Sequence, residues 1–452
     1  MVFVGVAVAV LALLVGVHRY VWRRFVGDTT AKGGVARRIG TVALFVLPML
    51  SVGALVSSRA GVPFRVQQVL AWPGYLWLAA LLYLTLALLV GEAVRPVLRR
   101  VLTHRAARSA AAEAETPAAT TTPTTATTAT TATDDAGPRS EPGTASGTGA
   151  ASAPASGTRT ETEPRTETEA PAVPSVADPS RRLFVARAVG GAAALAGLGT
   201  VGYGTYGVLR GPRVKRITVP LAKLPRSAHG FRIAVVSDIH LGPILGRAHT
   251  QRIVDSINAT RPDLVAVVGD LVDGSVADLG RAAEPLAQLE ARHGSYFVTG
   301  NHEYFSGAAE WVDHVRELGL HPLENARVEI GDFDLAGVND VAGESEGQGP
   351  DFVAALGDRD RGRASVLLAH QPVVIHDAVE HGVDLQLSGH THGGQLWPGN
   401  LLAELANPTV AGLERYGDTQ LYVTRGAGAW GPPVRVGAAS DITVVELASK
   451  QA

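Results

Sequence analysis

The sequence predicts an α/β fold in which two β-sheets pack face to face between flanking helices, preceded by transmembrane helices. Three observations predict this arrangement. Long uncharged apolar stretches occupy much of residues 1–105. Beyond residue 216, short runs rich in Val, Ile and Leu alternate with helical stretches. Asp, Asn and His follow several of these runs, where α/β proteins place their functional groups.

The composition limits the chemistry that the chain can use. Its 452 residues allow two or three domains, at roughly 100–200 residues each. The 40 basic and 42 acidic residues give a net charge of -2, so no overall positive charge indicates nucleic acid as a partner. The absence of cysteine excludes disulfides, thiol catalysis and zinc–thiolate sites. Any bound metal must therefore be held by Asp, His, Asn or Glu.

The first part of the chain contains three apolar stretches, at residues 1–17, 41–57 and 69–91. Their lengths are close to the roughly 17–25 residues that a helix needs to cross a bilayer, and none has a charge in its middle. We therefore predict a membrane domain with three transmembrane helices over residues 1–105. The alternative for residues 1–17 is a cleaved signal peptide, but that stretch lacks a basic start and a small-residue cleavage site.

A polar segment and a fourth apolar stretch follow. Residues 106–179 consist mainly of Thr, Ala, Pro, Ser, Gly and Glu, which predicts a disordered linker. Residues 180–210 begin with Arg181 and Arg182 and continue into the Gly- and Ala-rich apolar run 188–209. This resembles a twin-arginine export signal, although the positive-inside rule also places arginines before a span. Both interpretations predict a fourth span that leads outward.

Basic residues in the loops predict the orientation in the cell membrane. The loop after the first span is rich in them and the loop after the second is poor, so the former is expected to be cytoplasmic. The segment after the third span is again basic, which agrees. The N-terminus and the domain that follows the fourth span are then extracytoplasmic. A basic cluster just after the fourth span opposes this orientation: Arg210, Arg213, Lys215 and Arg216.

The domain predicted over residues 215–450 opens in βαβαβ order. Its first three strands come before Asp238, Asp270 and Asn301, with helices expected near residues 247–259 and 279–292. Five further strand-like runs follow, with fewer helices between them.

The first three strands each lead into potential metal ligands. Asp238 and His240 are two residues apart, which would place both side chains on one face of an extended chain. Asp270 follows Gly269, which permits close backbone approach, and a carboxylate can bridge two cations about 3.5–4 Å apart. Asn301 offers an amide oxygen, with His302 beside it. Each motif alone is typical of an ordinary turn.

Two later strands lead into histidines: His370 follows one, and His390 and His392 follow the next within Gly-His-Thr-His-Gly-Gly. Imidazole suits zinc, iron and manganese, and the flanking glycines permit a tight loop. The occurrence of all five motifs at successive strand ends is far more specific than any one of them. Together they predict a site that holds metal ions.

The five motifs, Asp-x-His, Gly-Asp-x-x-Asp, Gly-Asn-His-Glu, His and Gly-His-x-His, resemble the calcineurin-like metallophosphoesterase family, especially its bacterial membrane-associated branch. The resemblance covers residues 215–447. It implies the two-sheet sandwich of that family and two divalent metal ions, Mn, Fe or Zn. It also implies that one ion is held by Asp238, His240 and His392, a second by Asn301, His370 and His390, with Asp270 bridging both and His302 as the proton donor.

The expected function is that of a membrane-tethered phosphoesterase, which hydrolyses a phosphomonoester or phosphodiester by metal-activated water. A lipid-linked phosphate is a candidate substrate because the domain is tethered at a membrane. The expected partners are the substrate and the membrane, without nucleic acid, and the sequence indicates no protein partner. Two alternatives stay open, a nucleotide phosphodiesterase and a metal-binding membrane sensor without turnover. The spans lack internal ionisable residues, which argues against ion transport.

Overall fold

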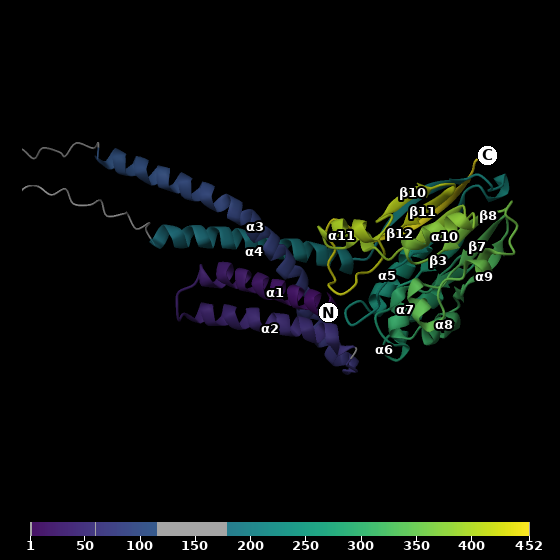
Figure 1. Cartoon of the computed structure of the whole chain (residues 1–452), viewed down its shortest axis with the longest axis horizontal. Coiled ribbons are helices and arrows are strands. Elements are labelled where there is room, and N and C mark those ends of the chain that lie inside the picture. Colours follow the sequence, from purple (N-terminus) through teal and green to yellow (C-terminus); the bar gives the residue numbers. More distant parts are fainter. Residues whose placement is uncertain (1, 59, 115–178, 452) are drawn as a thin grey trace, which may run out of the picture. The chain divides into compact units, whose positions relative to one another are not determined.

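The computed structural model describes residues 2–58, 60–114 and 179–451. Within them, the helices that precede the first strand (Figure 1) are α1 (Val2–Trp22), α2 (Val35–Ser57), α3 (Phe64–Ala114) and α4 (Pro179–Leu209). By length and composition, three helices in this described part could cross a membrane: Val35–Ser57, Phe64–Ser109 and Arg181–Leu209. These contain the stretches 41–57, 69–91 and 188–209. Residues 2–17 of the remaining stretch lie in α1, a helix of 21 residues.

The described residues at both ends of the linker predicted over residues 106–179 are helical instead. Helix α3 continues to Ala114, because residues 106–114 (AARSAAAEA) are mostly alanine, the residue with the highest helix propensity. Helix α4 already begins at Pro179, and proline is favoured in the first turn of a helix. The rest of the predicted linker, residues 115–178, lies outside the described residues.

The chain forms two compact units, one of Met1–Val97 with Leu183–Ala452 and one of Leu98–Arg182. The first unit contains helices and the domain that follows them. Within it, Phe64 at the start of α3 packs against a core cluster of the domain. Val208, near the end of α4, packs against Leu245 and Ala429. The start of α3 and the end of α4 therefore both contact the domain.

The domain contains two β-sheets, as the sequence predicts, and each sheet has six strands. In the first, the order is β1-β12-β2-β3-β4-β5, and β2 to β5 are parallel. In the second, the order is β10-β11-β9-β8-β7-β6, and β7, β8, β9 and β11 are parallel. The strands of the first sheet are β1 (Arg213–Leu221), β2 (Phe231–Val236), β3 (Leu264–Val268), β4 (Ser295–Val298), β5 (His321–Pro322) and β12 (Asp441–Ser449). Those of the second are β6 (Ala326–Ile330), β7 (Phe333–Gly337), β8 (Ala364–Leu368), β9 (Leu385–Ser388), β10 (Gly412–Tyr416) and β11 (Thr419–Val423).

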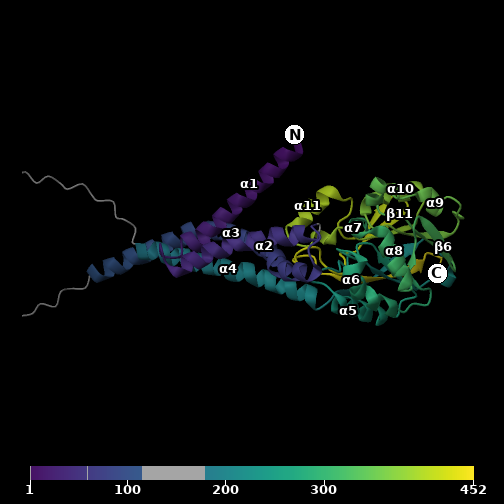
Figure 2. The ribbon, with the colours of Figure 1, turned by 90° about the horizontal axis from the view of Figure 1, so that it is seen from below.

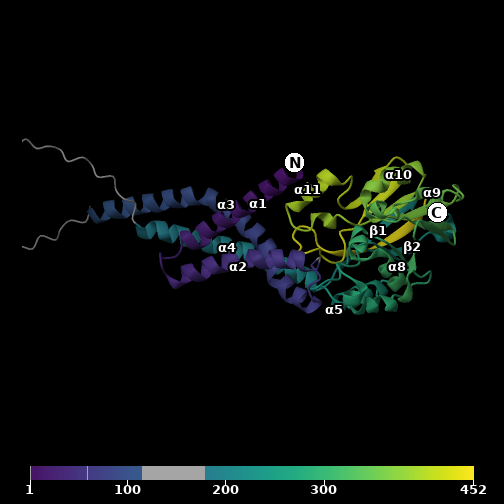
Figure 3. The same ribbon diagram turned by 60° about the horizontal axis from the view of Figure 1, so that its bottom comes forward.

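Alternating side chains of the central strands fill two kinds of core. One set lies between the sheets, where Val235 and Val268 of the first sheet meet Leu368 and Leu387 of the second. The opposite set packs against helices, which cover the first sheet with α5, α6 and α8 and the second with α9 and α10. In Figure 2 and Figure 3, α9 and α10 lie along one margin of the domain and α5 along the other.

The helices of the domain are α5 (Arg247–Asn258), α6 (Val276–Ala283), α7 (Asn301–Ser306), α8 (Ala308–Glu317), α9 (Phe352–Leu356), α10 (Ile375–Glu380) and α11 (Gly399–Ala406). Helix α5 agrees with its prediction. The helix predicted over residues 279–292 is wrong in its bounds. It begins after Ser275, whose side chain accepts a hydrogen bond from the backbone of Asp278, and it gives way to a 3-10 turn that contains Pro285.

Candidate metal centre

All five sequence motifs meet where strands of both sheets end. Strands β2, β3 and β4 of the first sheet and β8 and β9 of the second each lead directly into one of them. Three groups of three side chains form there, and in each group the potential ligand atoms lie within 4.8 Å of one another. The first group is Asp238, His240 and His392, the second is Asp270, His370 and His390, and the third is His240, Asp273 and His302.

The backbone conformation of these residues differs from the predicted one. Asp238 and His240 have φ angles of 53° and 48°, so they lie in left-handed conformation and not on one face of an extended chain as predicted. Asp270, His390 and His392 are left-handed as well. Each such non-glycine residue costs about 1–3 kcal/mol and clusters of them mark functional sites. The left-handed conformation allows the side chains of Asp238 and His240, which are two positions apart, to point into the same group.

Two glycines allow the strand ends to approach closely. A Cβ atom on Gly300 would lie 2.3 Å from Oδ1 of Asp270, and one on Gly389 would lie 2.4 Å from Oδ2 of Asp238. Neither position leaves room for a side chain. The loop after β4 therefore touches the loop after β3 at Gly300. In the same way, the loop after β9 touches the loop after β2 at Gly389.

His370 has the environment of a metal-binding histidine. Its Nδ1 lies 2.8 Å from the carbonyl oxygen of Val268, which orients the ring. Its buried Nε2 makes no hydrogen bond, although it lies 3.1 Å from Oδ2 of Asp270. Burial opposes a charge on this ring, but the carboxylate of Asp270 outweighs burial and raises the pKa of His370 well above its usual value. A positive charge is favoured between these two side chains, and a divalent cation would supply it.

Asn301 and His390 lie together on the open side of the second group. Oδ1 of Asn301 is 3.0 Å from Nδ1 of His390. The main-chain nitrogen of His390 also donates to the carboxylate of Asp238, at 3.0 Å from Oδ1. Burial, together with the nearby positive charge of His370, lowers the pKa of His390 to about 4. His390 is therefore neutral at physiological pH, as metal ligation through imidazole requires.

Asp273 is held by two histidines at once. Its Oδ1 lies 2.8 Å from Nδ1 of His240 and 2.7 Å from Nδ1 of His302. Burial favours the neutral acid, but the charges and hydrogen bonds of the two rings outweigh it and lower the pKa of Asp273 to about 2. Asp273 therefore supports the two rings from behind. A carboxylate behind a metal-binding histidine fixes the ring so that Nε2 faces the ion.

The second histidine on Asp273, His302, stands at the margin of the metal centre. Its main-chain nitrogen donates to Oδ1 of Asp270 at 2.9 Å, and its ring meets that of His240 edge-on, with centroids 4.7 Å apart. Phe305 and Trp430 contact the other parts of the ring. Because Asp273 holds Nδ1, Nε2 is the nitrogen left to act on a substrate.

Glu303 contributes to the centre without being a predicted ligand. Its side chain is fully buried and accepts hydrogen bonds from the main-chain nitrogens of Asp270, Leu271 and Gly300, at 2.9, 2.8 and 2.6 Å. Burial and the charge of Asp270 raise the pKa of Glu303 to about 7. The available signal was the glutamate three residues after Gly300, a spacing typical of a helix N-terminus.

Arg435 is the other functional candidate that sequence reasoning missed. It is buried, and its Nη2 lies 3.0 Å from Nδ1 of His392, while Nη1 donates to the carbonyl oxygen of His392. A guanidinium only donates hydrogen bonds. Arg435 therefore fixes the orientation of the His392 ring, because its donors hold both Nδ1 and the carbonyl oxygen of that residue. No short motif predicts this contact, because 43 positions separate the two residues.

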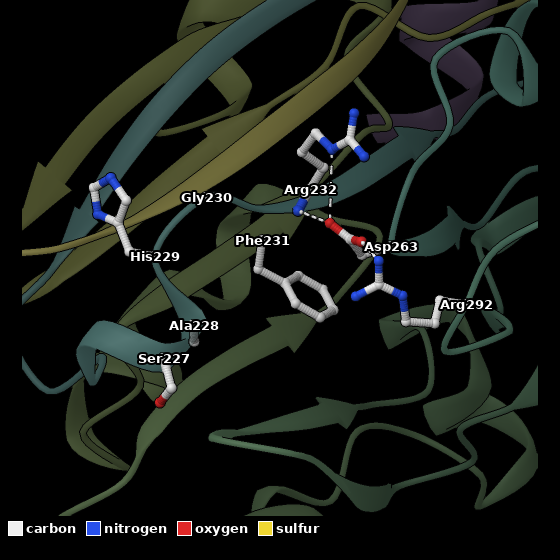
Figure 4. Close-up of a pocket in the computed structure, with 8 residues that line it drawn as sticks. All are labelled: Ser227, Ala228, His229, Gly230, Phe231, Arg232, Asp263 and Arg292. Atoms are coloured by element: carbon white, nitrogen blue, oxygen red, sulfur yellow. Dashed lines mark hydrogen bonds and ion pairs between the residues drawn. The ribbon is translucent and has the colours of Figure 1, made fainter.

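A separate cavity of about 400 Å³ lies away from these motifs, and none of the predicted ligands lines it (Figure 4). Asp263 is its only acidic group. The main-chain nitrogen of Arg232 donates to Asp263 at 2.8 Å, and a side-chain nitrogen of Arg292 lies 3.5 Å from the same carboxylate. Asp263 is thus already paired within the protein, and the cavity offers no group comparable to the histidine and carboxylate cluster.

Comparison with known proteins shows which family the chain resembles. A model of the calcineurin-like phosphoesterase family matches residues 231–394. The chain is 40% identical to the "Transmembrane protein with metallophosphoesterase domain" of Danio rerio, over 54% of this chain and 59% of that protein. It is 38% identical to a metallophosphoesterase of Helicobacter pylori, over 57% of this chain and 69% of that protein. It is 33% identical to one of Aquifex aeolicus, over 53% of this chain and 92% of that protein. The chain thus matches less than two thirds of the length of its Danio rerio relative.

Proposed function

Because the chain belongs to the calcineurin-like phosphoesterase family, we propose that it is a membrane-tethered enzyme that hydrolyses a phosphate ester with two divalent metal ions. The observation that carries the proposal is the pair of side-chain groups at the strand ends, Asp238 with His240 and His392, and Asp270 with His370 and His390. Two adjacent groups with converging imidazole and carboxylate atoms suit two cations in one site.

The division of ligands follows these two groups. One ion would be held by Asp238, His240 and His392. The second would be held by His370 and His390 together with Asn301, whose oxygen lies 3.0 Å from the ring of His390. Asp270 would lie between the ions, because it belongs to the second group and its Oδ2 is 3.7 Å from Nε2 of His240 in the first. Zinc, iron and manganese all suit this mixture of donors.

When bound, such ions polarise a phosphoryl group and make water a nucleophile at neutral pH. The chain's own residues complete the reaction. His302 would give a proton from Nε2 to the departing oxygen, since its Nδ1 is held 2.7 Å from Asp273. Asp273 orients both His302 and His240 and so couples the proton donor to the metal centre.

A lipid-linked phosphate is the substrate that we favour. The domain is continuous with helices that could cross a membrane, and Phe64 of α3 packs directly against it. A relative of Danio rerio bears the name of a transmembrane protein with this kind of domain. An enzyme held at a membrane meets lipid phosphates at high local concentration, because both partners are confined to one surface.

We also propose that the catalytic domain is extracytoplasmic in the cell membrane. The basic loops between the first and second spans and after the third support this orientation. The packing of α3 and α4 supports a last span that returns the chain to the side on which the span before it begins. The start of α3 and the end of α4 both contact the domain, so these two helices reach it from opposite chain directions.

The proposal is tested with the full chain in lipid nanodiscs, loaded in turn with manganese, iron or zinc. Nitrophenyl monoester, nitrophenyl diester and phosphatidic acid serve as substrates, and phosphate or nitrophenolate release is measured. We expect turnover with at least one metal and its loss in Asp270→Asn, with secondary structure retained by circular dichroism. A folded, metal-loaded chain that turns over none of the substrates would support a metal-binding sensor instead.

A further inference from the structure

Helix α11 exposes an unusual amount of apolar surface. It has no buried residue, and Leu401, Leu402 and Leu405 are 56, 71 and 85% exposed. Its only charged residue is Glu404. Contiguous apolar surface on a soluble face mostly marks an interaction site, because its exposure to water is unfavourable.

The exposed leucines continue into large side chains around the proton donor. Trp397 precedes α11 and is 53% exposed, while Trp430 and Phe305 are 56 and 69% exposed. The rings of Phe305 and Trp430 lie 5.5 and 5.8 Å from that of His302. The side-chain nitrogen of Gln395 donates to the carbonyl oxygen of Trp430 at 2.9 Å and so ties their loops together. We call this surface the apolar rim: Phe305, Trp397, Leu401, Leu402, Leu405 and Trp430.

The apolar rim is joined to a predicted membrane span. The hydroxyl of Tyr83 donates to the carbonyl oxygen of Trp397 at 3.0 Å. Tyr83 lies within the apolar stretch 69–91 of α3, about 21 Å beyond its first residue at 1.5 Å per residue. Leu396, Val434 and Val436 pack into the same cluster as side chains of α3 and α4. The rim therefore begins beside the apolar part of a membrane helix and not beyond its end.

We propose that the apolar rim is immersed in the lipid bilayer, with the leucines of α11 facing the acyl chains. Tryptophan and leucine are side chains that membrane-bound helices bury in lipid. Because α11 carries no basic residue, its contact does not depend on anionic lipid. A membrane lipid could then reach His302 without leaving the bilayer. This last step rests on the hydrolysis proposed above, whereas the lipid contact itself rests only on membrane tethering.

The first experiment uses the absence of cysteine in the chain. Leu405→Cys is the test variant, and Val353→Cys on α9 is the control, because Val353 is 70% exposed and Leu405 is 85% exposed. Each variant accepts one environment-sensitive fluorophore without competing thiols. The full chain is placed in phosphatidylcholine nanodiscs with and without a spin-labelled lipid quencher. We expect blue-shifted, quenched emission for the label at position 405 and neither change at position 353.

Equal behaviour of the two labels would overturn the proposal. So would a blue shift at position 405 without quenching by lipid, because that combination indicates burial against protein, such as a second copy of this chain. Neither readout requires turnover, so failure of the proposed hydrolysis would leave this experiment interpretable.

A second experiment measures the consequence for substrates. In Leu402→Gln/Leu405→Gln, turnover of phosphatidic acid should fall about tenfold or more, on the scale of losing one buried leucine. Hydrolysis of a water-soluble nitrophenyl ester should be unchanged, because the substituted side chains do not contact the metal centre. Val353→Gln serves as the matched control. Equal loss on both substrates would show that the variant damages the site, and no loss on either would contradict a role for the rim.

Discussion

At the scale of single residues, Asp273 organises the candidate site. One of its oxygens lies within 2.8 Å of Nδ1 atoms from both His240 and His302, so one carboxylate holds the proposed metal ligand and the proposed proton donor together. Removal of either histidine should therefore affect different steps. This distinction can be measured, because metal content and turnover are separate readouts.

We predict that His302→Ala lowers kcat about 10²- to 10⁴-fold, the usual contribution of a general acid, and leaves the metal content unchanged. The loss should be larger for an alkyl phosphate than for a nitrophenyl phosphate, since nitrophenolate departs without protonation. Metal content is measured by plasma mass spectrometry. An equal loss for both leaving groups would contradict the assignment of His302 as proton donor.

Asp273→Asn should behave differently. We expect about a 10- to 100-fold loss of activity or metal affinity, as for other residues that orient metal ligands. Because His240 loses its carboxylate partner, metal titration should show weaker binding in this variant and not in His302→Ala. Identical metal affinity in both variants would show that Asp273 acts on the proton donor alone.

At the scale of elements, the site is assembled by loops that follow parallel strands of two different sheets. Glu303, in the first turn of α7, accepts main-chain hydrogen bonds from the loop after β3 and the loop after β4. Left-handed residues then turn Asp238 and Asp270 inward. The position of each ligand thus depends on a neighbouring loop as well as on its own strand.

We predict that Glu303→Gln destabilises the domain by about 1–3 kcal/mol, because a glutamine has one acceptor oxygen and leaves a buried main-chain donor unpaired. Urea unfolding of the full chain in detergent, followed by circular dichroism, measures this. Glu290→Gln is the matched control, since Glu290 is exposed. Equal unfolding midpoints for the two variants would exclude the proposed role of Glu303 in joining the loops.

At the scale of the whole molecule, the orientation in the membrane decides which phosphate esters the site can meet. Two basic loops favour an extracytoplasmic domain, whereas the cluster from Arg210 to Arg216 favours the opposite. An even number of spans places the N-terminus and the domain on one side. The packing of Phe64 and Val208 brings the start of α3 and the end of α4 to the domain, and it bears on these two helices alone.

We predict that a β-lactamase reporter fused after Arg108 stays cytoplasmic, and that the same reporter at the C-terminus is active outside the membrane. Drug resistance of the host measures both positions. Fluorescent-protein fusions at the same points give the complementary readout. Reporters found on the same side of the membrane would contradict four spans.

The sequence by itself determined the two-sheet class, the five motifs and the apolar stretches, because each of these depends on residue type and short spacing. It did not determine the left-handed turns, the helix bounds around Pro285 or the roles of Glu303 and Arg435. Those features depend on contacts between residues that are distant in the sequence. His240 and His392, for example, are 152 positions apart, but their Nε2 atoms lie 3.0 Å from each other. The apolar rim is a further case. Leucines of α11 form an ordinary helical pattern in the sequence, and only the tertiary structure leaves them exposed close to Trp397, whose carbonyl oxygen accepts a hydrogen bond from Tyr83 of α3.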